Sequence, residues 1–83
     1  MADSIKIKII YFARLREAIE LDEEIIMLPK GALPSDAQKL LNEKYDLNID
    51  TNLKVAINDQ FSDWDKELSD GDRLVFIPPV TGG

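Results

Sequence analysis

Apolar and polar residues alternate at the start of the chain. Residues 5–12 read Ile-Lys-Ile-Lys-Ile-Ile-Tyr-Phe, and a period of two is typical of a β-strand with one buried face. The apolar face runs through the odd-numbered positions from Ile5 to Tyr11. The opposite face begins charged and ends apolar: Lys6, Lys8, Ile10 and Phe12. We therefore expect the odd positions to meet the core and an apolar end to remain on the other side of the sheet.

Two helices are predicted between the strands. Residues 13–20 have a helix-forming composition, with Arg16 and Glu20 at i,i+4 spacing. The second helix begins with a Ser-x-x-Gln capping box, in which Ser35 is the predicted N-cap and Gln38 its partner. Apolar residues then recur at helical spacing on one face: Ala37, Leu40, Leu41 and Tyr45. This second helix is the one expected to pack across the sheet.

The remaining apolar stretches predict four more strands, over residues 24–28, 53–57, 61–64 and 73–77. Asn58-Asp59 and Asp70-Gly71-Asp72 are turn signals between them. Strands and one main helix must then share a core, which predicts an α+β fold, a mixed sheet with the helix across one face. The first and last strands have the most continuous apolar runs, so we expect them to be central.

Alternate residues of the last predicted strand should face opposite sides of the sheet. Leu74 and Phe76 should face the core, which leaves Arg73, Val75 and Ile77 on the open face. If the first and last strands are parallel neighbours, Phe12 and Ile77 meet at one end of the sheet, with Phe61 joining from the edge. An exposed apolar patch of this kind is a candidate partner-docking surface. The alternative is that these residues fill a second small core.

Composition limits the function classes. The chain has 83 residues, 45% hydrophobic and 31% charged, as expected for one small folded domain. The N-terminus lacks the features of a signal peptide and no apolar run could span a bilayer, so we expect a cytoplasmic protein without membrane contact. A net charge of −6 argues against nucleic acid and favours a basic protein partner.

Histidine and cysteine are absent from the sequence. This excludes disulfides, thiolate nucleophiles, Cys/His zinc sites and imidazole bases. Asp46-x-Asn48-x-Asp50 begins like a calcium loop, but Thr51 stands where the glycine is needed and Ile57 where the glutamate is needed. A solvated edge explains three nearby carboxylates better than an acid–base pair does: Asp63, Asp65 and Glu67. We therefore expect no intrinsic active site, no metal and no cofactor bound by the chain itself.

The C-terminal residues read Pro78-Pro79-Val80-Thr81-Gly82-Gly83. The prolines cannot continue a sheet, so we divide the chain into a domain of residues 1–77 and an extended tail of residues 78–83. Six extended residues reach about 20 Å, and glycines let the backbone approach catalytic groups closely. We predict that Pro78, Pro79, Val80, Thr81 and Gly82 bind within a partner's active site. The carboxylate of Gly83 is then the reacting group, which adenylation could activate for conversion to a thiocarboxylate.

The chain resembles the small, sulfur-carrier subunits of molybdopterin synthase. Four blocks carry the resemblance: residues 11–17 (Tyr-Phe-Ala-Arg-Leu-Arg-Glu), 56–58, 68–72 and the terminal 76–83. The resemblance implies a β-grasp, ubiquitin-like fold with parallel first and last strands. It also implies that an E1-like enzyme uses ATP to adenylate Gly83. The resulting thiocarboxylate would donate sulfur to the pterin precursor in the large synthase subunit, within a heterotetramer of two small and two large subunits.

The resemblance also places the family's docking positions on Phe12, Phe61 and Ile77, and suggests a partner contact for Arg16. Two segments depart from the family pattern, the Asn58-Asp59-Gln60 turn and the Leu33-Pro34 helix entry. Two alternatives remain open: a sulfur carrier for thiamine or cysteine synthesis, and a β-grasp interaction module without a carrier role. An intrinsic enzyme is opposed by the missing histidine and cysteine.

Overall fold

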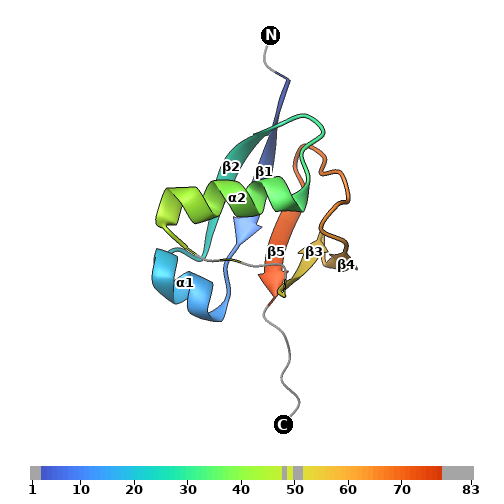
Figure 1. The fold of residues 1–83 in the computed structure, drawn as a ribbon. Helices are drawn as coiled ribbons and strands as arrows, with labels where there is room; N and C mark the ends of the chain where they lie inside the picture. Colours follow the sequence, from blue (N-terminus) through green and yellow to red (C-terminus); the bar gives the residue numbers. More distant parts are fainter. Residues whose placement is uncertain (1–2, 48, 50–51, 78–83) are drawn as a thin grey trace.

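Strands β1 (Ser4–Ile10) and β5 (Arg73–Ile77) are parallel neighbours inside one mixed sheet. The computed structural model describes residues 3–47, 49 and 52–77. Its sheet has the strand order β2-β1-β5-β3-β4, so both β1 and β5 are flanked on each side, as predicted. The other elements are α1 (Ala13–Ile19), β2 (Glu23–Pro29), α2 (Pro34–Tyr45), β3 (Lys54–Ile57) and β4 (Gln60–Ser62). Helix α2 crosses one face of the sheet (Figure 1), which confirms the α+β, β-grasp arrangement.

The core lies between the sheet and α2. All four predicted positions of β1 and its extension are buried, and the strand parities of β5 and β3 agree with them. Buried residues of the core include Ile5, Ile7, Ile9, Tyr11, Ala37, Leu41, Val55, Ile57, Leu74 and Phe76. Trp64 covers one end of this core: its ring stacks 5.8 Å from that of Phe76, and its Nε1–H donates to the Leu53 carbonyl at 3.0 Å.

Helix α2 begins one residue earlier than its predicted cap. Leu33 is the N-cap and Pro34 opens the helix, so the Ser35 cap and its Gln38 partner were wrong predictions. Proline suits this first position because its fixed φ is helical and its missing N–H would have no partner there. The carboxylate of Asp36 then accepts the Leu33 N–H at 2.8 Å. Gln38 instead donates from Nε2 to the Ile49 carbonyl at 2.6 Å.

Two strands also stop two residues before their predicted ends. Strand β1 stops at Ile10 and not at residue 12, because Phe12 becomes the N-cap of α1 and its carbonyl accepts the N–H of Leu15 at 3.1 Å. Strand β4 ends at Ser62 because Trp64 turns inward onto Phe76. The predicted turns are present: Asn58 and Asp59 have φ of 51° and 71°, which matches a type I′ hairpin, and Gly71 has φ of 88°.

Several predictions fall on residues that the structure does not describe. The tail, Pro78 to Gly83, lies outside the described residues, as do Asn48, Asp50 and Thr51 of the rejected calcium loop. Asp46 of that loop is the C-cap of α2, with φ of 53°. Within the described part of the chain, none of the helices is both long and apolar enough to cross a membrane.

Candidate functional site

The sheet face opposite α2 carries a row of apolar side chains. The strand registers pair Ile10 with Val75, Val75 with Ala56, and Ala56 with Phe61, so the row crosses four strands. Val75 and Ala56 are each only 7% exposed, although they lie on this open face. Phe61, at the β4 end of the row, is 74% exposed. The row is therefore a continuous apolar floor that is shielded from water at Val75 and Ala56 and has the exposed ring of Phe61 at one end.

A second apolar group lies at the end of the sheet where β5 stops. Ile77 pairs with Lys54 and is half-buried. Phe12 follows Ile10 by two residues and Ile77 follows its partner Val75 by two residues, so both lie at the same end of these neighbouring strands. Phe12 is 50% exposed. The exposure of Phe12 and Phe61 does not fit the alternative that these residues fill a second small core, since core side chains are shielded from water.

The three predicted docking residues do not form one tight cluster. Phe12 and Ile77 lie at the same end of adjacent strands, whereas Phe61 lies two strands from β5 and opposite Ala56. Adjacent strands are about 4.8 Å apart, so Phe61 stands about 10 Å from β5. Together these residues border the floor of Val75 and Ala56. We refer to Phe12, Ile77, Val75, Ala56 and Phe61 as the apolar surface.

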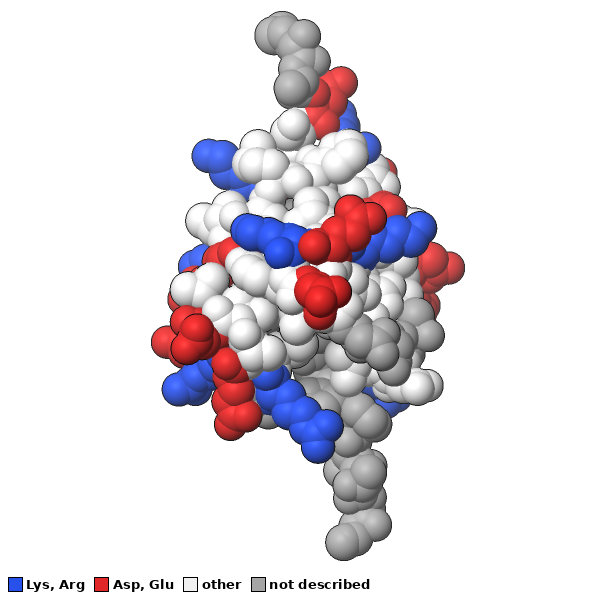
Figure 2. Space-filling model, turned by 60° about the vertical axis from the view of Figure 1, so that its left-hand side comes forward, with Lys and Arg blue, Asp and Glu red and all other residues white. Residues whose placement is uncertain are grey.

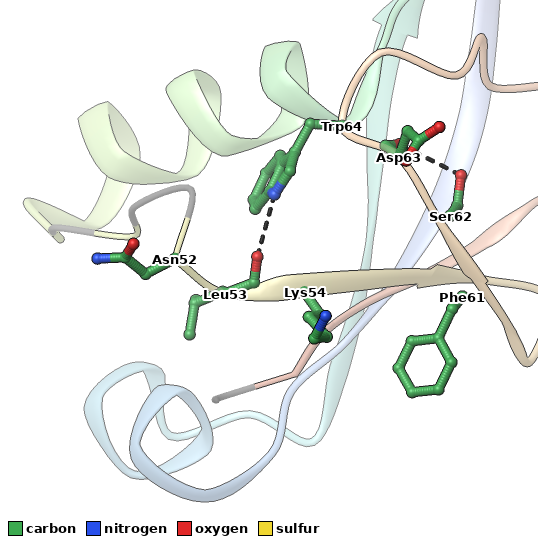
Figure 3. A pocket seen from close by; sticks show the side chains of 7 residues that line it. All are labelled: Asn52, Leu53, Lys54, Phe61, Ser62, Asp63 and Trp64. Atoms are coloured by element: carbon green, nitrogen blue, oxygen red, sulfur yellow. Dashed lines mark hydrogen bonds between the residues drawn. The ribbon is translucent and has the colours of Figure 1, made fainter. Parts of the chain in front are cut away.

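An open hollow adjoins this surface at the β3–β4 edge (Figure 3). Phe61 and Lys54 project to the side of the strands away from α2, whereas Trp64 lies on the α2 side. The lining residues are Asn52, Leu53, Lys54, Phe61, Ser62, Asp63 and Trp64. The lining side chains include the carboxylate of Asp63, the ammonium group of Lys54, and the hydroxyl of Ser62, which donates to the backbone carbonyl of Asp63 at 3.2 Å. The hollow can accept a side chain of a partner, but its lining residues do not form an acid–base pair.

The other carboxylates do not converge either. Asp63, Asp65 and Glu67 are all exposed on the segment after β4. Within residues 3–47, 49 and 52–77 we found no group of three side chains placed to hold a metal ion.

Arg16 lies on α1, one helical turn after Phe12. Its Nε contacts the Asp22 carboxylate at 3.0 Å, and both side chains are mostly exposed. An exposed ion pair of this kind contributes little to stability, so the guanidinium can exchange Asp22 for another acidic group. A partner contact for Arg16 stays a prediction.

The structure describes the chain up to Ile77, the residue that precedes the predicted tail. Ile77 is the last residue of β5, an interior strand, and belongs to the apolar surface. The predicted tail-binding residues Pro78, Pro79, Val80, Thr81 and Gly82, and the reacting residue Gly83, follow directly in the sequence and lie outside the described residues. The division of the chain after residue 77 likewise stays a prediction.

The sequence reasoning missed a polar cluster around Glu24, on the α2 side of the sheet. Its carboxylate accepts hydrogen bonds from the Tyr11 hydroxyl at 2.6 Å, the Tyr45 hydroxyl at 2.7 Å and the Lys44 ammonium at 3.3 Å. Burial raises the pKa of the Glu24 carboxyl, but these three donors outweigh burial, so its pKa lies below the ordinary value of 4.5. Burial and the bond to Glu24 raise the pKa of the Tyr11 hydroxyl well above its ordinary value.

This cluster fixes the end of β1 that leads into the apolar surface. Tyr11 directly precedes Phe12, and Tyr45 is the last residue of α2. Tyr11 follows β1, Glu24 lies in β2, and Lys44 and Tyr45 end α2. These three segments are far apart in the sequence, so no local motif could have indicated the cluster. The bonds tie the C-terminal end of α2 to the strand that presents Phe12.

Comparisons with known proteins agree with this geometry. The chain matches the model of the ThiS family over residues 9–83. The molybdopterin synthase sulfur carrier subunit of Escherichia coli (strain K12) is 31% identical over 80 residues, which cover 93% of this chain and 99% of that protein. A solved structure of molybdopterin converting factor subunit 1 from Pyrococcus furiosus has a TM-score of 0.79 and 34% identity, and covers 92% of this chain and 99% of that one.

A further similar structure comes from a protein–protein complex of subunits 1 and 2 of molybdopterin-converting factor from Helicobacter pylori 26695. It has a TM-score of 0.66 and 26% identity, and covers 95% of this chain and 100% of that chain. The family match and the relatives span almost the whole sequence, from β1 to the terminal Gly-Gly. The chain therefore belongs to the ThiS family and, within it, to the molybdopterin synthase sulfur carrier subunits.

Proposed function

We propose that this chain carries sulfur for molybdopterin synthesis on its C-terminal residue, Gly83, as a thiocarboxylate. One observation carries the proposal: the match to sulfur carrier subunits spans nearly the whole chain, and the family match runs through residue 83. The tail follows an interior strand whose last residue, Ile77, is part of the apolar surface. A firmly held strand gives the tail a fixed point of departure next to a surface that a partner can bind.

The chemistry follows from the low electrophilicity of the terminal carboxylate carbon, which adenylation raises by providing AMP as a leaving group. A carboxylate oxygen of Gly83 attacks the α-phosphorus of ATP, which releases pyrophosphate and leaves an acyl adenylate. A sulfur donor at the sulfide oxidation level then attacks the carbonyl carbon, and AMP leaves. The terminal sulfur of the thiocarboxylate then attacks a carbon of the pterin precursor and displaces an oxygen substituent, which gives a thioester joining the two molecules. Hydrolysis of its acyl C–S bond leaves the sulfur on the precursor and returns the Gly83 carboxylate.

The catalytic groups for these steps are assigned to partners. An E1-like enzyme supplies the ATP site, and the large synthase subunit supplies the site for the pterin precursor. The complex of subunits 1 and 2 seen for the Helicobacter pylori relative supports a large-subunit partner. We assign Phe12, Phe61 and Ile77 to the contact with that partner, and a heterotetramer of two small and two large subunits follows from the family resemblance.

Mass spectrometry tests the carrier step directly. The chain is incubated with ATP, an E1-like activating enzyme and a sulfide source, and we expect a mass gain equal to the replacement of one oxygen by sulfur. Fragmentation should place the gain on Gly83. The matched control lacks Gly83 alone, and it should keep its fold and gain no mass. Sulfur transfer by the chain without Gly83 would contradict the proposal.

The choice of pathway needs a second readout. The thiocarboxylate form is mixed with a molybdopterin synthase large subunit and a pterin precursor, and formation of the dithiolene is followed. A chain that is charged with sulfur but donates it only in thiamine or cysteine synthesis would favour those carriers. A chain that binds partners but is never charged with sulfur would be an interaction module.

A further inference from the structure

Strand β2 forms one free edge of the sheet in the described part of the chain. It pairs with β1 alone, and its residues alternate between exposed and more buried positions. Ile25 is 61% exposed and Met27 is 52% exposed. These two residues lie on the open face but outside the apolar surface, because Lys8 and Lys6 stand between them and β5.

The backbone hydrogen bonds tell which groups of β2 point outward. The Tyr11 N–H donates to the Asp22 carbonyl at 2.9 Å, and the Lys30 N–H donates to the Asp3 carbonyl at 2.7 Å. In an antiparallel pair the bonded groups alternate along the strand, so the even-numbered residues from Asp22 to Lys30 direct their backbone groups toward β1. The odd-numbered residues direct theirs away from the sheet: Glu23, Ile25, Met27 and Pro29.

In the described part of the chain, Ile25 and Met27 thus combine unpaired backbone groups with exposed apolar side chains, whereas the Pro29 carbonyl accepts the Ala32 N–H at 3.1 Å. Natural proteins usually protect such an edge with lysine, a bulge or a proline. In β2 such protective features are found only at the two ends of the strand. Glu23 forms an ion pair with Lys8 at 3.1 Å, and Pro29 lacks an N–H. The middle of the edge, Ile25 and Met27, is open to pairing with another strand.

We propose that this edge pairs with the same edge of a second copy of the chain, antiparallel and about a twofold axis through Ile26. In this register Ile25 lies opposite Met27 of the second copy, and Glu23 lies opposite Pro29. The outward N–H groups of Glu23, Ile25 and Met27 then each face a carbonyl across the axis. The Glu23 carbonyl is left without a donor because Pro29, which lies opposite, has no N–H, and the Pro29 carbonyl already accepts the Ala32 N–H at 3.1 Å. The exposed apolar side chains of both copies meet in one group.

Charge complementarity selects this register over its neighbours. Asp22 and Lys30 flank β2, and the register places Asp22 of one copy opposite Lys30 of the other. A shift that placed Glu23 opposite Met27 would bury the carboxylate against apolar groups, which costs free energy.

Figure 2 turns forward the side of the molecule on which β2 and α1 lie, and broad areas of it carry neither Lys or Arg nor Asp or Glu. The pairing uses no residue of the apolar surface, so it is independent of the carrier function.

Sedimentation equilibrium measures the pairing. One seven-residue edge is smaller than a standard interface, so we expect a weak dimer in a series from about 10 μM to about 1 mM. The mass should rise with concentration from 9.4 kDa toward twice that value. Met27→Lys should weaken dimerisation by about tenfold or more, because lysine blocks edge pairing. Gln60→Lys, the same charge change on the opposite edge strand, should leave it unchanged. A monomer at every concentration would overturn the proposal.

Hydrogen exchange and a charge swap test the mode of pairing. The amides of Ile25 and Met27 should exchange fast in dilute protein and slow down as the concentration rises, whereas that of Ile26 should be protected throughout. Asp22→Lys alone should weaken the dimer, and the double variant with Lys30→Asp should restore it. A dimer that leaves the Ile25 and Met27 amides unprotected, or protection of them only when another protein is added, would contradict pairing between copies.

Discussion

At the scale of single residues, Glu24 shows how a half-buried charge is made tolerable. Only 13% of its side chain is exposed, and isolated carboxylates in such places are costly. The hydroxyls of Tyr11 and Tyr45 and the ammonium of Lys44 all donate to it. Hydrogen bonds to a charged acceptor are stronger than neutral ones, which is why the net effect favours the ionised form. The same residue holds the end of β1 in place next to Phe12.

We predict that Glu24→Gln lowers the free energy of unfolding by about 1–3 kcal/mol at neutral pH. The amide keeps the shape of the side chain but loses the charge, and one of its ends presents a donor to the tyrosine hydroxyls. Chemical denaturation of both proteins measures the difference. Glu23→Gln is the matched control: its ion pair with Lys8 is exposed, so that variant should change stability by less than about 0.5 kcal/mol.

The effect should depend on pH with a defined sign. The pKa of Glu24 is depressed in the folded state below its ordinary value of 4.5, so the unfolded state takes up a proton first as the solution is acidified. The stabilisation is therefore present above about pH 4.5 and is lost as the pH falls through the folded-state pKa. The gap between wild type and Glu24→Gln should narrow over that window. A gap that stays constant down to low pH would show that the charge of Glu24 does not stabilise the fold.

At the scale of elements, periodicity predicted which segments are strands and helices, and neighbouring elements decided where they end. All five strands and both helices lie where the hydrophobic pattern indicated. The ends moved where a tertiary contact intervened: Phe12 caps α1, Trp64 stacks on Phe76, and Pro34 with Asp36 starts α2. A capping box read from Ser35 and Gln38 had the right form but the wrong register, because Gln38 is used to hold Ile49.

The start of α2 gives a test of that correction. We expect Asp36→Ala to cost about 1 kcal/mol of unfolding free energy, since it removes the carboxylate that accepts the Leu33 N–H at 2.8 Å. Ser35→Ala should change stability by less than about 0.5 kcal/mol. Urea denaturation with an unchanged slope distinguishes the two. Larger destabilisation by Ser35→Ala than by Asp36→Ala would instead support the cap expected from the sequence.

At the scale of the whole molecule, the sheet separates two roles. The face toward α2 holds the core and the Glu24 cluster, and the open face holds the apolar surface at the end from which the tail continues. The exposed edge of β2 lies on the other side of β1. The residues assigned to the proposed docking surface, the proposed reactive end and the proposed pairing edge therefore do not overlap.

We predict that Phe12→Asp weakens binding to a molybdopterin synthase large subunit by about 2 kcal/mol or more, in line with aromatic residues at the centre of interfaces. Thermal stability should change little, because Phe12 is 50% exposed and lies outside the core. Calorimetric titration measures the affinity, and Phe12→Leu should retain most of it. A large fall in melting temperature for Phe12→Asp would show that the residue supports the fold and not a partner contact.

The sequence alone was sufficient for the fold class, the parity of β1 and β5, the turns and the family. These four features depend on local periodicity and on short motifs that can be recognised in the sequence itself, such as the Asp-Gly-Asp turn and the terminal Gly-Gly. The sequence also indicated Phe12, Phe61 and Ile77 as open-face residues. The roles of these residues and of Gly83 are proposals that the experiments above address.

Tertiary structure alone decided three further features: the partners of Glu24, the true cap of α2 and the outward direction of Ile25 and Met27. Each depends on groups that are distant in the chain, such as Tyr11, Glu24 and Tyr45, or on a hydrogen-bond phase that only a paired neighbour defines. Periodicity tells which face of a strand is apolar. It cannot tell which edge stays unpaired, because that depends on the order in which the strands assemble into the sheet.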